Sequence, residues 1–166
     1  MHEDKLFFKD DINGNAIFYL DENCTEPYTG KLEEYFQGFL NVESDIVDGF
    51  KNGISKEYYK FGSELKSISQ MRYNLNTGLM IEFYKDGSIS GISLSVNEYA
   101  LEYVYYDENG NIEYEKYREK TFETFKVRKE IKGIVQELLE KYDLRKINEE
   151  IMREGKNFDY KKNFGL

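Results

Sequence analysis

The sequence predicts a mainly β protein with a C-terminal α part: an antiparallel meander of repeated β-hairpins, capped by one or two helices. Two observations predict this fold class. A motif that runs from Gly53 to Gly62 returns 25 residues later, from Gly78 to Gly87. Self-similarity at a fixed period of this length indicates a repeat architecture. After Tyr117 the apolar residues recur at helical spacing instead, which predicts that the meander ends there.

Length and composition are those of one soluble domain with a charged surface. The chain has 166 residues, 33% of them charged, and a formal net charge of −9. Aromatic residues make up 16% and there is a single proline, which favours strands over disorder. Phosphate binding needs clustered Lys and Arg, so the charge argues against nucleic acid and anionic membranes as partners. We see no signal peptide or membrane span and expect a cytoplasmic location.

The predicted strands begin with a hairpin and continue as repeats. Apolar runs at residues 6–8 and 16–20 flank Asn13-Gly14, a dipeptide that favours tight hairpin turns. From about residue 28 to 117, each repeat reads as a strand, a turn that ends in glycine, and a return strand. The four turn glycines are Gly38, Gly62, Gly87 and Gly110.

Alternation along these strands predicts the two faces of the sheet. The face expected to be buried carries Ile54, Tyr58, Leu79, Ile81, Phe83, Leu101, Tyr103 and Tyr105. The opposite face then carries Glu57, Tyr59, Glu82, Tyr84 and Tyr106.

An apolar stripe at helical spacing predicts helix from about residue 121 to 154. The stripe consists of Val127, Ile131, Ile134, Val135, Leu138, Leu139 and Tyr142. We expect Ile131, Val135 or Leu138 to contact the core of the sheet. Thr121 or Thr124 would cap the first helix, and Asp143 would cap a second, shorter one that ends at Gly155.

Three regions follow from this pattern. Residues 1–118 form the hairpin repeats and residues 119–157 the helical cap. Residues 158–166 show no clear pattern and are expected to be a flexible tail.

The repeats resemble the bacterial variant of the MORN (membrane occupation and recognition nexus) repeat. The likeness is carried by Tyr28-Thr29-Gly30 with Glu34–Gly38, by Asp48–Gly53 with Glu57-Tyr58-Tyr59, and by Asn76-Thr77-Gly78 with Glu82–Gly87. It covers about residues 17–117. It implies the hairpin-repeat fold and, because such proteins are often antitoxins of toxin–antitoxin pairs or immunity proteins, a protein-binding function. The fourth repeat departs from the pattern, with Val104 where Glu57 and Glu82 stand, and we interpret it as a capping repeat.

The residue types that carry most catalytic chemistry are scarce. His2 is the single histidine and lies near the N-terminus, while Cys24 is the single cysteine, so the chain offers no His-based triad and no disulfide. Stretches around Gly14 and Gly110 resemble calcium loops. Both lack the bidentate glutamate at the last position, and we interpret them as turns. We therefore expect no enzyme activity, no metal and no cofactor.

The strongest candidate site is the row formed by Glu57, Tyr59, Glu82 and Tyr84. Tyrosine offers rigid contact area, and acidic neighbours select a basic partner. A purely structural interpretation is also open, because cross-strand tyrosine pairs stabilise a sheet. Four acidic residues expected in turns would rim this surface: Asp45, Asp48, Asp107 and Glu108.

The residues and the resemblance together predict a protein that binds another protein. The first hypothesis is an immunity or antitoxin protein that neutralises a toxin, with a basic nuclease domain as the expected kind of partner. The second is a structural or scaffold repeat module that binds another protein or peptide. An acidic-residue hydrolase is the third, since 32 Asp and Glu residues can always supply a carboxylate pair.

Overall fold

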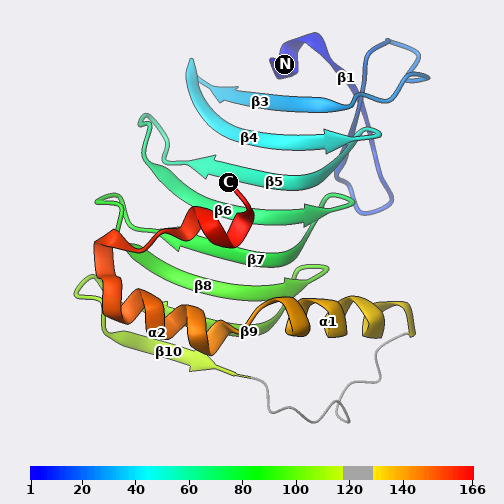
Figure 1. The fold of residues 1–166 in the computed structure, drawn as a ribbon. Helices are drawn as coiled ribbons and strands as arrows, with labels where there is room; N and C mark the ends of the chain where they lie inside the picture. The colour runs from blue at the N-terminus through cyan, green and yellow to red at the C-terminus, as the bar shows by residue number, and fades with distance from the viewer. Residues whose placement is uncertain (118–128) are drawn as a thin grey trace. The chain divides into compact units, whose positions relative to one another are not determined.

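The computed structural model describes residues 1–117 and 129–166 and divides the chain into two compact units, Met1–Asn76 and Thr77–Leu166. Both units are built from antiparallel strands that pair with their chain neighbours, and the second unit adds helices (Figure 1). The predicted fold class, a hairpin meander followed by helices, is confirmed. The predicted caps Thr121 and Thr124, the stripe residue Val127, the helix start at 121 and the boundary at 118/119 lie outside the described residues.

The first unit contains a short 3-10 helix, a separate hairpin and a meander. The helix is η1 (Glu3–Lys5), and the hairpin pairs β1 (Phe7–Asp10) with β2 (Ala16–Tyr19). The meander consists of β3 (Gly30–Phe36), β4 (Phe39–Val47), β5 (Phe50–Tyr58) and β6 (Leu65–Arg72). The predicted opening hairpin is confirmed, and Gly14 supplies its left-handed turn residue with a φ of 82°.

A small core lies where the opening hairpin meets the meander. Its buried side chains are Phe18, Tyr28, Leu32 and Ile46, with Leu6 and Ala16 packed alongside. The backbone N–H of Phe18 donates to the carbonyl of Gly49 at 2.9 Å, and that of Tyr28 donates to the carbonyl of Phe18 at 2.9 Å. These bonds hold β2 against the turn between β4 and β5. The hairpin therefore completes a core that the repeats of this unit do not form alone.

In strand β5 the predicted core is wrong. Ile54 and Tyr58 were assigned to a fully buried face, but every residue of β5 is only partly buried. The alternation is present in the sequence, yet burial requires a layer packed on the strand. Residues 1–76, all of which the structure describes, contain no α-helix that supplies such a layer.

In the part that the structure describes, the second unit contains four strands, two α-helices and two 3-10 helices. The strands are β7 (Leu75–Phe83), which begins just before the boundary, β8 (Ile89–Val96), β9 (Tyr99–Tyr106) and β10 (Ile112–Lys116). The helices are α1 (Lys129–Lys141), α2 (Leu144–Glu154), η3 (Gly155–Asn157) and η4 (Tyr160–Phe164).

In this unit the predicted core of β7 is confirmed. Leu79, Ile81 and Phe83 are buried, and Ile81 is paired across the strands with Ile92. Helix α1 packs on β8, and α2 packs on β8 and β9. Val135 and Leu138 of α1 are buried, as expected of the apolar stripe. The helices therefore form a layer against the sheet, and the apolar residues on that face of the strands are fully buried.

In strand β9 the predicted core is confirmed at Leu101, which is buried, and is wrong at Tyr103 and Tyr105. Tyr103 and Tyr105 are half-buried, whereas Val104 and Tyr106 are buried. The register shifts between Leu94 and Ser95 of β8, so β9 carries one extra residue there. Since successive side chains point to opposite faces, a bulge of one residue exchanges the faces of everything that follows. The sequence pattern alone does not reveal this shift.

The C-terminal elements begin and end partly as predicted. Asp143 caps α2, because its side chain accepts a hydrogen bond from the N–H of Lys146 at 3.2 Å, and Gly155 follows the last residue of the helix. Residues 158–166, predicted to be a flexible tail, instead contain η4 and bury Phe158 and Phe164. The ring of Tyr160 meets that of Phe83 edge-on at 5.1 Å between centroids. The segment is held by separate aromatic side chains. Their spacing does not follow a helical period, so the sequence pattern did not indicate that they are buried.

Candidate functional site

The predicted acidic and aromatic row is divided between the two units, so each half is described by itself. In the first unit Glu57 lies in β5 and is half-buried, and its Oε1 atom is 2.7 Å from Nζ of Lys66. Tyr59 follows at the start of the loop to β6, where its N–H donates to the carbonyl of Glu64 at 2.9 Å. The charge of Glu57 is therefore partly balanced by a neighbour on the next strand.

In the second unit Glu82 lies in β7 and Tyr84 follows that strand; both are half-buried. The hydroxyl of Tyr84 donates to the carbonyl of Tyr106 at 2.6 Å. Burial, and secondarily the negative charge of Glu82, raises the pKa of the Tyr105 hydroxyl. Glu82 thus shares its face of the sheet with an aromatic group, and Tyr84 has a structural hydrogen bond of its own.

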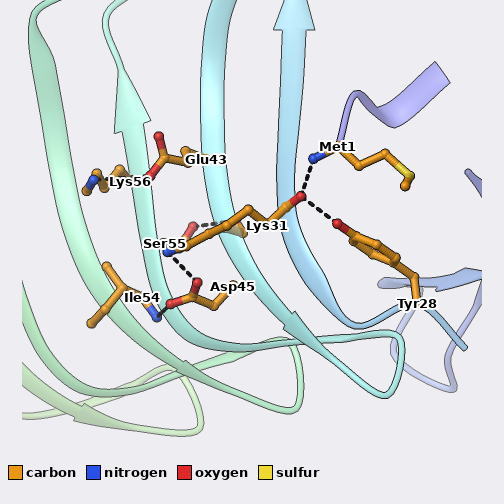
Figure 2. A network of polar contacts seen from close by, with 9 residues as sticks. Met1, Tyr28, Lys31, Glu43, Asp45, Ile54, Ser55 and Lys56 are labelled. Atoms are coloured by element: carbon orange, nitrogen blue, oxygen red, sulfur yellow. Dashed lines mark hydrogen bonds and ion pairs between the residues drawn. The ribbon is translucent and has the colours of Figure 1, made fainter. Parts of the chain in front are cut away.

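Asp45 differs from the prediction that it lies in an acidic turn. It sits inside β4, half-buried, and forms an ion pair with Lys31 while its Oδ2 atom accepts a hydrogen bond from the N–H of Ile54 at 2.9 Å (Figure 2). The pairing of β4 with β5 is irregular between Ser44 and Ile46, and such an irregularity interrupts the regular ladder of hydrogen bonds. The carboxylate of Asp45 closes this gap, which is a structural task.

The other three acidic residues do lie in turns. Asp48 is exposed, has a φ of 50°, and donates its N–H to Oγ1 of Thr29 at 3.0 Å. Asp107 accepts hydrogen bonds from the N–H groups of Asn109 and Asn111 at 2.9 and 2.8 Å. Glu108, in the same turn, is exposed. Asp48 and Glu108 therefore present their side chains to solvent, whereas Asp107 organises its own loop.

The two stretches that resemble calcium loops have the same internal geometry. Asp11 accepts hydrogen bonds from the N–H groups of Asn13 and Asn15 at 2.7 and 2.9 Å, as Asp107 does in the other loop. Hydrogen bonds from Asn15 and from Asn111 are the largest causes that lower the pKa of Asp11 and Asp107 respectively. Within the described ranges, no three His, Cys, Asp or Glu side chains are grouped so as to hold a metal ion.

The single histidine is placed by contacts that the sequence did not indicate. The ring of His2 stacks on that of Tyr35 with centroids 4.6 Å apart, and residue 2 bridges Glu33 of β3. The amino group of Met1 and the hydroxyl of Tyr28 both donate to the carbonyl of Lys31, as Figure 2 shows. These contacts attach the N-terminal residues to β3.

An exposed aromatic cluster at one end of the first unit was missed by sequence reasoning. Phe36 ends β3, Phe39 begins β4, and Phe61 lies in the loop between β5 and β6; we call these three residues the tip cluster. The ring of Phe61 lies 6.0 Å from that of Phe36 and 5.8 Å from that of Phe39. A signal was present, since each of these residues stands next to a predicted turn where polar residues are usual.

The backbone of Phe61 is also unusual. Its φ is 63°, in the left-handed region that bulky side chains rarely adopt. The corresponding loop of the second unit, Tyr84 to Ser88, places a glycine, Gly87, in that region. Gly62 was predicted to end this turn, but Phe61, the residue before it, has the positive φ.

Comparisons with known proteins add no identification. No family model matches the chain, and no curated protein or solved structure matches it. Among the helices in the described part of the chain, none has both the length and the apolar character needed to cross a membrane.

Proposed function

We propose that this protein is a cytoplasmic, non-enzymatic binding protein of the antitoxin or immunity type, which neutralises a toxin with a basic surface. The observation that carries the proposal is the distribution of charge. Residues 1–117 contain 22 Asp and Glu against 10 Lys and Arg, a net charge of −12, whereas the rest of the chain is net positive. The negative charge therefore belongs to the hairpin region.

A large negative charge on one region affects how fast and how selectively a protein binds its partner. Complementary charges accelerate the encounter of two proteins and suppress wrong partners, while buried aromatic anchors supply most of the affinity. The hairpin region combines both, with exposed acidic residues such as Asp48 and Glu108 and partly exposed tyrosines such as Tyr59. The resemblance to bacterial MORN-type repeats supports the antitoxin role rather than another binding role.

One observation favours the second candidate, a structural or scaffold module. Tyr84, Asp45 and Asp107 make internal hydrogen bonds and so contribute to the fold itself. A scaffold would use the hairpins as a framework and would have no toxin partner. The two candidates differ in whether the protein protects cells.

The test begins with the genes on either side of this one. A neighbouring gene for a protein with a toxic, basic C-terminal domain would supply the partner, and otherwise capture at low salt with release at high salt would supply it. The purified partner is then mixed with this protein, and both association and inhibition of the toxin are measured. An antitoxin binds with an on-rate that falls as salt is added and restores cell growth. A scaffold does neither.

Substitutions then locate the acidic surface. Glu57→Lys and Glu82→Lys, made singly and together, are expected to slow association, because each reverses a charge in its own half of the predicted row. Glu137→Lys on the exposed side of α1 is the matched control with the same change in charge. The fold should survive all three changes, since the charges of partly or fully exposed side chains contribute little to stability. Unchanged binding by the double variant would exclude this row as the site.

A further inference from the structure

The tip cluster is an exposed, ordered group of aromatic rings. Phe36, Phe39 and Phe61 expose 42%, 45% and 58% of their surfaces. Ring centroids separated by 5.8 and 6.0 Å lie within the range of favourable aromatic pairs, so the three side chains support one another. The ammonium of Lys60 lies over the ring of Phe36, 5.2 Å from its centroid. The cluster is therefore a preformed apolar surface rather than three separate side chains.

The conformation of Phe61 argues that its ring is retained for a contact outside the chain. A phenylalanine with a φ of 63° carries backbone strain, and asparagine or glycine would adopt this angle more readily. Burial would offset the strain, but more than half of the side chain is exposed. Strained residues cluster at binding sites. Phe61 differs from Tyr73, which is also exposed at a positive φ, because the Phe61 ring lies against two other exposed rings.

We propose that the tip cluster is the apolar anchor by which this protein holds a basic protein partner. The partner would offer an apolar pocket for the Phe61 ring, bordered by Lys and Arg side chains. The inference deepens the proposed function and rests on it, since it names the contact that gives the binding its affinity. Glu57 and Tyr59 stand on the same hairpin as Phe61, so the anchor adjoins the first half of the acidic row.

Charge identifies the partner as a basic protein and argues against a second copy of this chain. The first unit contains 14 Asp and Glu against 8 Lys and Arg. Two copies would bring like charges together, and like charges across an interface disfavour association. Beside the cluster, the exposed Glu64 holds its carboxylate over Gly62, where a Cβ would lie 2.0 Å from Oε2. Positive side chains around the partner's pocket would pair with the carboxylate of Glu64 and with the other acidic residues of the first unit.

Area supports the same choice. A phenylalanine side chain presents roughly 200 Å², so the three exposed fractions leave about 300 Å² of aromatic surface. A stable interface buries about 800 Å² on each partner. The cluster is thus too small to hold two flat surfaces together and is suited to be the central anchor of a larger, polar contact.

The experiment uses the full chain and the purified basic partner obtained in the test of the proposed function. Phe61→Asn removes the ring and relieves the strain at the positive φ. We expect its Tm to rise while its Kd for the partner weakens at least about 30-fold, mainly through faster dissociation. If Phe61 were only a structural residue, binding would also weaken, but the Tm would fall instead of rise.

Tyr73→Asn is the matched control. Tyr73 is also an exposed aromatic residue at positive φ, with a φ of 50° and 60% of its surface exposed, but it lies in the turn that follows β6, at the other end of that strand from Phe61. This variant should gain Tm as Phe61→Asn does and keep its Kd within about 2-fold. Equal losses of affinity in both variants would show a general effect of the substitution and overturn the proposal.

The remaining outcomes separate the two proposals. If the wild type binds the basic partner and Phe61→Asn binds it equally well, the anchor is wrong and the proposed function stands. If the wild type binds no basic protein, both are wrong. Sedimentation of the wild type and of Phe61→Asn, each without the partner, gives one more outcome. If the wild type dimerises and the variant does not, the cluster binds a second copy of this chain and the choice of partner is overturned.

Discussion

The two units share one hairpin repeat but bury it to different depths. In the second unit, α1 and α2 pack on the sheet, and the alternating residues Leu79 and Ile81 are completely buried. In the first unit, Ile54 occupies the same position in its repeat as Leu79 but is only half-buried, as is the whole of β5. The comparison shows that the repeat motif determines which face of the sheet a side chain lies on. Whether that face is buried depends on a second layer packed against it.

The first unit compensates with polar contacts between strands. Ion pairs join Lys51 to Glu34 at 2.6 Å and Lys56 to Glu43 at 3.1 Å, and the hydroxyls of Ser44 and Ser55 lie 2.8 Å apart. Each such contact contributes little by itself, since partly exposed ion pairs are worth about 0–1 kcal/mol. We therefore expect core substitutions to be more costly in the second unit than in the first.

The largest effect is expected from truncation of the buried core. Ile81→Ala should reduce the free energy of unfolding by about 2–5 kcal/mol, because Ile81 is fully buried and a cavity remains. Ile54→Ala, at the position of the first unit that corresponds to the equally buried Leu79, should cost less than about 2 kcal/mol because water already reaches the Ile54 side chain. Urea denaturation of both variants measures the difference. Equal losses would mean that the two units do not differ in burial as described.

Glycine substitutions test the backbone of the two units. Gly53 in β5 has a φ of 135°, and a Cβ there would lie 2.7 Å from Cβ of Asp45, so Gly53→Ala should cost about 2 kcal/mol or more. Gly133 in α1 has open space around it, and Gly133→Ala should instead stabilise the protein by up to about 1 kcal/mol. Thermal unfolding distinguishes the two signs. A stabilising Gly53→Ala would contradict the tight contact with Asp45.

A buried polar network distinguishes the helix-covered unit by its pH dependence. The hydroxyl of Tyr106 donates to Oδ1 of Asn148 at 2.7 Å, and Nδ2 of Asn148 donates to the hydroxyl of Tyr117 at 2.8 Å. Tyr106→Phe should cost about 1–3 kcal/mol at pH 8, because the amide oxygen of Asn148 loses its donor.

Burial also raises the pKa of Tyr106 well above its ordinary value of 10.0. The folded state then keeps this proton at a pH where the unfolded chain releases it, so the contribution is complete below about pH 10 and declines as the pH rises further. The difference in stability between the wild type and Tyr106→Phe should narrow between pH 8 and pH 11. A constant difference would show that Tyr106 titrates alike in both states.

The smallest effect is expected from the ion pairs of the first unit. Lys56→Met removes the charge that faces Glu43 and should change the free energy of unfolding by less than about 1 kcal/mol, with a smaller difference at high salt. A loss of several kcal/mol would indicate that the polar contacts stabilise this unit as strongly as apolar packing stabilises the other. Double-mutant analysis with Glu43→Gln isolates the pair.

Much of the fold was predictable because its signals are local. The hairpin turn at Gly14, the alternation of β7 and the cap at Asp143 each depend on residues within a few positions of one another. The candidate site was less predictable. Asp45 fits a sequence pattern for an exposed acidic turn, yet it closes an irregularity of the ladder between β4 and β5, which depends on how the two strands pair.

The amino-acid sequence by itself determined the hairpin repeat, its turns, the change to helices and the negative charge of the hairpin region. These depend on side-chain periodicity, turn residues and counts of charged groups, which need no knowledge of distant neighbours. Only the tertiary structure decided the exchange of faces in β9, the docking of Phe158 and Phe164, and the gathering of the tip cluster from two separate hairpin connections. The exchange of faces depends on how β8 and β9 pair, and the other two result from contacts between residues far apart in the chain, so register and packing outweigh local preference.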